Sequence, residues 1–183
     1  TARTGELQIK EFDPGAAPMV TIALDVQTLP RSYEYLPDTL EYIIMVAASI
    51  AMHALDEQYQ VGLYANGLTR HAETWSQVRP GRGVHQETEL LSAFAALEPF
   101  RGMPFDELLV ALSPEMAFGT GVIAITAHLR EDILEALDSL QRSGHPVLLL
   151  TAGETMPYVP DSIPSFHLGE QYEWSQATRV ALA

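Results

Sequence analysis

The 183-residue chain contains no cysteine. This absence excludes a disulfide framework, a thiol nucleophile and a zinc site with cysteine ligands. A chain without cysteine suits a reducing compartment. We therefore expect a cytoplasmic protein, or the soluble domain of a membrane-anchored protein.

Basic residues are also scarce. The chain has 10 Lys and Arg against 24 Asp and Glu, which gives a formal net charge of −14. Such a surface repels phosphate backbones and anionic lipid headgroups, so we expect no nucleic-acid partner and no membrane contact within this chain. The acidity favours a basic protein partner, or serves solubility alone.

Long apolar runs are missing as well. The most apolar segment, Tyr42 to Leu55, is too short to cross a bilayer of about 30 Å, and it contains Ser49 and His53. It predicts a core helix that is apolar nearly all round. No signal peptide opens the sequence. Because the first residue is Thr1 and not Met, we expect the chain to be part of a longer protein.

Apolar strands alternate with helices along the chain, a pattern typical of a parallel sheet with right-handed crossovers. We predict one α/β domain over residues 1–183, with a doubly wound, mainly parallel sheet and helices on both faces. The predicted strands are Glu6–Phe12 (antiparallel, at or near an edge), Met19–Val26, Tyr59–Gly67, Gly121–Ala127, His145–Gly153 and a short edge strand within Ser162–Gly169. The predicted helices are Asp38 to about Gln58, Glu87–Leu97, a segment between Pro104 and Pro114, and Leu129 to Gly144.

Two helix ends carry specific signals. Asp38 followed three residues later by Glu41 predicts a capping box at the start of the most apolar helix. Gly144 predicts the stop of the last helix.

In a doubly wound sheet, ligands bind outside the carboxyl ends of the strands. Asp25 stands directly after a buried strand, so it is the leading candidate for a functional side chain. The other polar residues that follow predicted strands are Gln27, Thr28, Asn66, Thr126, His128, Thr151 and Glu154.

The candidate residues are a weak set of metal ligands. Mg²⁺ prefers several oxygen ligands, and Asp25, Gln27, Thr28 and Thr126 offer them, but only Asp25 is charged. We therefore predict no cofactor and no resident metal, and Asp25 as the ligand if a metal does bind. The other interpretation is that Asp25 accepts hydrogen bonds from its own loop.

Catalytic motifs are absent from the sequence. The six histidines do not occur at metal-ligand spacing on a helix, and no Gly-x-Ser-x-Gly elbow occurs. We predict no catalytic residue, and a protein that is not an enzyme.

The opening segment TARTGELQIKEF resembles the signature of a bacterial family, domain of unknown function fifty-eight, whose members are similar to the von Willebrand factor A domain. The resemblance covers most of the chain and continues in order through VTIALDVQT, LEYIIMVAASIAMHAL, VGLYANG, RPGRG, ELLSAFAALEP, VIAITA and PVLLLTA.

Von Willebrand-type domains often carry a metal-ion-dependent adhesion site. The resemblance places its first element, Asp-x-Ser-x-Ser, on Asp25, Gln27 and Leu29, so that only the Asp is kept. The loop FRGMP lacks the threonine of the second element, and Ala127 and His128 stand where the third element has an Asp. The resemblance thus implies a degenerate metal site.

Members of this family are often encoded beside MoxR-type AAA ATPases. The resemblance implies a non-catalytic protein-interaction or assembly module that docks through the residues at the carboxyl ends of the strands. These residues are Asp25, Gln27, Thr28, Thr126 and His128. Two alternatives stay open: a divalent-metal-dependent ligand binder or hydrolase that uses Asp25 and Thr126, and a scaffold that only connects other parts of a longer chain.

Overall fold

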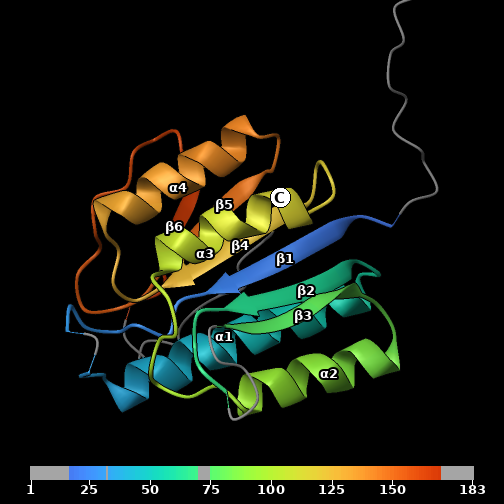
Figure 1. Ribbon diagram of the computed structural model, residues 1–183, viewed down its shortest axis with the longest axis horizontal. Helices are drawn as coiled ribbons and strands as arrows, with labels where there is room; N and C mark the ends of the chain where they lie inside the picture. The colour runs from blue at the N-terminus through green and yellow to red at the C-terminus, as the bar shows by residue number, and fades with distance from the viewer. Residues whose placement is uncertain (1–16, 32, 70–74, 170–183) are drawn as a thin grey trace, which may run out of the picture.

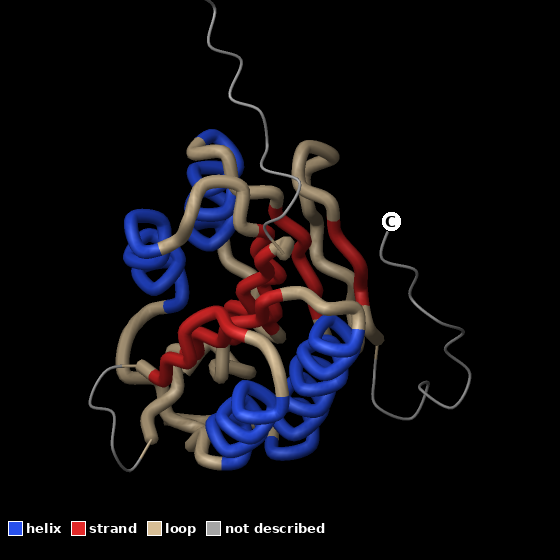
Figure 2. Tube along the Cα trace, turned by 90° about the vertical axis from the view of Figure 1, so that its right-hand side faces the viewer, coloured by secondary structure: helices blue, strands red, loops and turns tan. Residues whose placement is uncertain are grey.

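The computed structural model describes residues 17–31, 33–69 and 75–169. They form three layers, with one six-stranded sheet between two pairs of helices (Figures 1 and 2). The strands are β1 (Met19–Leu24), β2 (Gln60–Ala65), β3 (Ser76–Gly81), β4 (Gly121–Thr126), β5 (Val147–Thr151) and β6 (Ser165–His167). The helices are α1 (Pro37–Asp56), α2 (Val84–Ala95), α3 (Phe105–Leu112), the short 3-10 helix η1 (Ser113–Glu115) and α4 (Glu131–Arg142).

The strand order is β3-β2-β1-β4-β5-β6, and β1 lies between β2 and β4. All neighbouring pairs are parallel except β2 and β3, which are antiparallel. The predicted fold class is therefore confirmed. The antiparallel edge strand that the structure describes is β3, whereas the predicted N-terminal strand Glu6–Phe12 lies outside the described residues.

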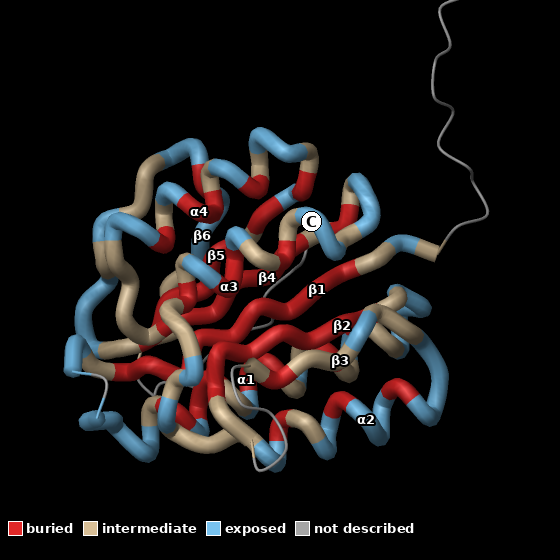
Figure 3. Tube along the Cα trace, viewed as in Figure 1, coloured by how far each residue is buried: buried red, intermediate tan, exposed pale blue. Residues whose placement is uncertain are grey.

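Both faces of the sheet are covered, which explains the near-continuous apolar strands. Val20, Ile22 and Leu24 of β1 pack with the layer of α1 and α2. Ala23 packs with the layer of α3 and α4. Figure 3 shows the result, with buried residues gathered along the strands. This arrangement leaves the carboxyl ends of β1, β2 and β4 side by side at one edge.

Helix α1 packs against β1, β2 and β4, so its predicted central position is confirmed. Its outer side faces solvent, because Met45, Ser49 and His53 are exposed. Among the described residues, α1 is the one helix whose length and composition would suit a membrane span, and its inner side packs in the core.

The start of α1 differs from the prediction. The helix begins at Pro37, a favourable first helical residue, so Asp38 lies inside the first turn and cannot be the N-cap. No side chain caps the helix. The backbone N–H of Leu36 donates instead to Thr28 Oγ1 at 2.8 Å, which ties this end of the helix to the loop after β1.

The end of α4 agrees with the prediction. Its last residue is Arg142, and Gly144 two positions later has a φ of 91°. This left-handed conformation is costly for residues with a Cβ atom, so glycine suits the position.

Thr21 in β1 provides a test of the packing. Its side chain is fully buried, and its Oγ1 atom makes no hydrogen bond within the described part of the chain. A buried hydroxyl without a partner costs free energy, so Thr21→Val should raise the free energy of unfolding by about 1 kcal/mol. Urea unfolding measures this change. The control Thr21→Ser keeps the hydroxyl and loses a methyl group, and should lower the free energy by about 1 kcal/mol. A destabilising Thr21→Val would contradict this view of the core.

Candidate functional site

Asp25 is fully buried at the point where three neighbouring strands end. Its Oδ1 atom accepts hydrogen bonds from Asn66 Nδ2 at 2.8 Å and from the backbone N–H of Gln27 at 3.0 Å. Its Oδ2 atom accepts one from Thr126 Oγ1 at 2.9 Å. The predicted hydrogen bond from the loop backbone to Asp25 is thus confirmed, and two strands contribute further donors.

The partners of Asp25 each hold a second backbone segment. Asn66, which follows β2, accepts a hydrogen bond from the backbone N–H of Val26 at its Oδ1 atom, at 2.9 Å. Thr126, which ends β4, accepts one from the backbone N–H of His128 at 3.1 Å. One carboxylate therefore organises the turns after β1, β2 and β4.

Gln27 extends this network toward the surface. Its Nε2 atom donates to the carbonyl oxygens of Leu29 and Pro30, at 2.8 and 3.2 Å, which shapes the loop after β1. Its Oε1 atom accepts hydrogen bonds from Arg101 Nη1 at 2.8 Å and from Arg130 Nη1 at 3.3 Å. Two of the chain's few basic side chains thus converge on one amide oxygen.

Both arginines are held by further contacts. Arg130 also binds Asp106 Oδ1 through Nη2 at 2.7 Å and Asp132 Oδ1 through Nε at 3.0 Å. The loop of Arg101 is joined to the end of β2, because Gly67 and Arg101 form an isolated β-bridge. A Cβ atom on Gly67 would lie 2.8 Å from Val26 Cγ1, so the close approach of these loops requires glycine there.

Burial dominates the electrostatics of the site. It raises the pKa of Asp25 to about 6, against the lowering effects of the hydrogen bonds from Asn66, Gln27 and Thr126 and of the Arg130 charge. Burial, followed by the charges of Arg130 and Arg101, lowers the pKa of His128. The carboxyl group therefore takes up a proton near pH 6, well above the usual range of an aspartate.

The residues around Asp25 do not fit a divalent cation. Both carboxylate oxygens already accept hydrogen bonds, and Thr126 Oγ1 is used by Asp25 and by His128. Leu29 offers no side-chain oxygen. Hard cations need several oxygen ligands, whereas the groups that approach Gln27 here are two guanidiniums. The part of the chain that the structure describes holds no cluster of three acidic, histidine or cysteine side chains with metal-binding geometry.

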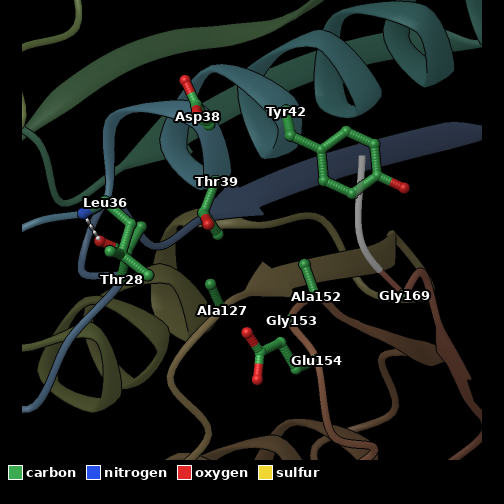
Figure 4. A pocket seen from close by; sticks show the side chains of 10 residues that line it. All are labelled: Thr28, Leu36, Asp38, Thr39, Tyr42, Ala127, Ala152, Gly153, Glu154 and Gly169. Atoms are coloured by element: carbon green, nitrogen blue, oxygen red, sulfur yellow. Dashed lines mark hydrogen bonds between the residues drawn. The ribbon is translucent and has the colours of Figure 1, made fainter. Parts of the chain in front are cut away.

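A cavity of about 390 Å³ opens beside this network, at the N-terminal end of α1. Figure 4 shows Asp38 and Thr39 on the α1 side of the cavity and Glu154 on the opposite side. Thr28 lines it as well, with its hydroxyl directed to the N–H of Leu36.

The predicted site residues thus divide by accessibility. Asp25 and Thr126 are in contact but fully buried, and Gln27 and Thr28 are nearly so. His128 is partly exposed. Thr151 lies next to Thr126 in the sheet, and its hydroxyl bonds to His167 Nδ1 at 2.9 Å.

Exposed aromatic and apolar side chains that the sequence did not reveal surround this network. Tyr35, on the loop after β1, and Phe100, on the loop after α2, pack edge to face with ring centroids 6.2 Å apart. Tyr33, Leu36 and Phe100 are 71%, 46% and 45% exposed. The proximity of these side chains depends on the way in which the two loops meet, and no local pattern signals it.

Comparisons with known proteins show the fold family. No protein-family model matches the sequence, and no curated protein matches it. The VWA domain of SpRpn10 has a similar structure, with a TM-score of 0.56 at 10% identity, over 85% of this chain and 90% of that domain. The chain has a von Willebrand factor A-like fold.

Two further proteins have similar structures. The conserved hypothetical protein BatB from Bacteroides thetaiotaomicron matches with a TM-score of 0.55 at 14% identity, over 87% of this chain and 94% of that one. The pilus adhesin SpaC from Lactobacillus rhamnosus GG matches with a TM-score of 0.52 at 12% identity, over 75% of this chain and 24% of that one. At these identities the similarity concerns the fold alone.

The raised pKa of Asp25 predicts that its contribution to the free energy of unfolding depends on pH. In the unfolded chain this carboxyl ionises near 3.8, and in the folded protein near 6. Between these values the folded state holds the proton that the unfolded state releases, so the contribution of Asp25 to stability falls as pH rises and is constant above the folded pKa.

Asp25→Asn isolates this effect, because an amide keeps the acceptor for Asn66 and Gln27 and presents a donor to Thr126. The unfolding free energy of the protein, relative to that of the variant, should fall by up to about 3 kcal/mol between pH 3.5 and 7. Urea titrations of both proteins across this range give the difference. A difference that is independent of pH would contradict the shift.

Proposed function

We propose that this von Willebrand factor A-like chain is a non-catalytic protein-interaction or assembly module, which docks through the loops at the carboxyl ends of β1, β2 and β4. The observation that supports this proposal most directly is the exposed pair Tyr35–Phe100 beside Arg101. Aromatic and arginine side chains are enriched among the residues that dominate binding energy at protein interfaces.

In this proposal the buried residues position the surface and do not touch the partner. Asp25 and Thr126 are fully buried, so their role is to hold the loops that carry Tyr35 and Phe100. Gln27 connects both loops, because it bonds to Leu29 on one side and to Arg101 on the other. His128 contributes its partly exposed ring.

The degenerate metal site is part of the same proposal. Arg101 and Arg130 supply positive charge next to Asp25 and Gln27, so partner binding does not require a cation. The resemblance to the domain of unknown function fifty-eight family makes a MoxR-type AAA ATPase the first partner to test.

Partner binding can be measured with the immobilised chain and a MoxR-type AAA ATPase encoded in the same genome. Tyr35→Ala or Phe100→Ala should weaken binding about tenfold or more, since central aromatic residues often contribute 2 kcal/mol. Tyr59→Ala is the matched control, because Tyr59 lies before β2 at the opposite edge and has the same 39% exposure as Tyr35. Equal losses in Tyr59→Ala and Tyr35→Ala would reject this docking surface, and no binding would reject the ATPase as partner.

The rival function, a divalent-metal-dependent binder or hydrolase, makes the opposite prediction for metals. We expect calorimetric titration with Mg²⁺, Mn²⁺ or Ca²⁺ to show no stoichiometric site tighter than about 1 mM, the weak end of ordinary calcium sites. A chelator should leave partner binding unchanged, whereas Asp25→Ala, checked for folding by circular dichroism, should weaken it. A tighter metal site that Asp25→Ala abolishes would favour the rival.

A further inference from the structure

An apolar groove of about 640 Å³ runs between α4 and the segment that joins β5 to β6. It lies on the α3–α4 side of the sheet, and the joining segment passes beside α4 (Figure 1). One wall is formed by Pro157, Tyr158 and Pro160. Tyr158 is 84% exposed and the neighbouring Met156 is 68% exposed, so this wall presents a large apolar area to solvent.

The opposite wall of the groove is α4, and its outer residues are acidic. Glu131, Glu135 and Asp138 all line the groove. Asp138 is paired with Arg142. Glu131 and Glu135 make no ion pair with any residue that the structure describes. Arg130 also lines the groove, but its guanidinium is engaged by Asp106, Asp132 and Gln27. The groove therefore has one apolar wall and one wall with unpaired negative charge.

The spacing of the two free carboxylates matches an extended chain. Four residues of α-helix separate Glu131 from Glu135 along the axis by about 6 Å. Residues i and i+2 of an extended strand are about 7 Å apart and point to the same side, while the residue between them points to the other. A strand that lies in the groove would thus direct every second side chain to α4 and the others to Pro157, Tyr158 and Pro160.

We infer that this groove binds an extended segment of a partner protein in which basic and apolar residues alternate. The basic side chains pair with Glu131 and Glu135, and the apolar side chains pack against the wall of Pro157, Tyr158 and Pro160. The net charge of −14 attracts such a segment over a longer range. This second surface is independent of the function proposed for the loops at the carboxyl ends of the strands.

The test uses the whole chain and a fluorescent synthetic peptide, KLKVKL. Fluorescence anisotropy gives the dissociation constant, and amide chemical shifts locate the site. We expect shifts in α4 and in residues 156–163. The isomeric peptide KKKLVL has the same charge but does not alternate, so it should bind about fivefold more weakly.

Two matched pairs of variants distinguish peptide binding in this groove from binding at other surfaces of the protein. Glu131→Gln with Glu135→Gln should weaken KLKVKL binding about fivefold, whereas Glu87→Gln with Glu89→Gln, the same charge change on exposed residues of α2, should leave it within about twofold. For the apolar wall, Tyr158→Ser should weaken binding and Tyr33→Ser should not. Both tyrosines are exposed, so these changes do not threaten folding.

Several results would overturn the inference. Equal binding of KLKVKL and KKKLVL would mean attraction by charge alone. A larger loss in Tyr33→Ser than in Tyr158→Ser would place the peptide at the other surface. The peptide KLKVKL could also fail to bind while sedimentation velocity shows a dimer that Tyr158→Ser abolishes. That result would assign the groove to a second copy of the chain. No binding by a monomer would mean that the groove is closed to peptides or filled by the chain itself.

Discussion

The burial of one carboxylate, that of Asp25, is the constraint on which this edge of the molecule depends. A buried ionisable group is costly unless hydrogen bonds compensate it. Asn66, the backbone of Gln27 and Thr126 provide these bonds, and they come from the ends of three different strands. The loops that carry the exposed side chains of the site are therefore positioned from beneath by a group that solvent cannot reach.

Two of the few basic side chains of this acidic protein lie next to this carboxylate. Both oxygens of Asp25 already accept hydrogen bonds, so the residues around it do not fit a divalent cation. Arg101 and Arg130 converge on Gln27 beside Asp25, and Arg130 lowers the pKa of that carboxyl.

Two surfaces of different chemistry are available for partners. The first joins an exposed aromatic pair to the charge of Arg101 at the carboxyl ends of the strands. The second joins a proline and tyrosine wall to unpaired carboxylates on α4. They lie on different elements and call for different partner segments.

The sequence by itself determined the layered α/β architecture, because apolar runs of strand length separated by amphipathic segments allow few other folds. It also placed Asp25 at the site-bearing edge, since ligands of doubly wound sheets bind at the carboxyl ends of the strands. It identified the stop at Gly144 from residue chemistry alone. These features depend on neighbours along the chain.

Only the tertiary structure decided the partners of Asp25, the convergence of Arg101 and Arg130 on Gln27, and the contact between Tyr35 and Phe100. It also replaced the capping box predicted at Asp38 with a hydrogen bond from the Leu36 N–H to Thr28, within the loop that leads into α1. Apart from the bonds inside this loop, these interactions join residues that are far apart in the sequence. Their geometry is set by strand register and by the way in which loops meet after the sheet has formed.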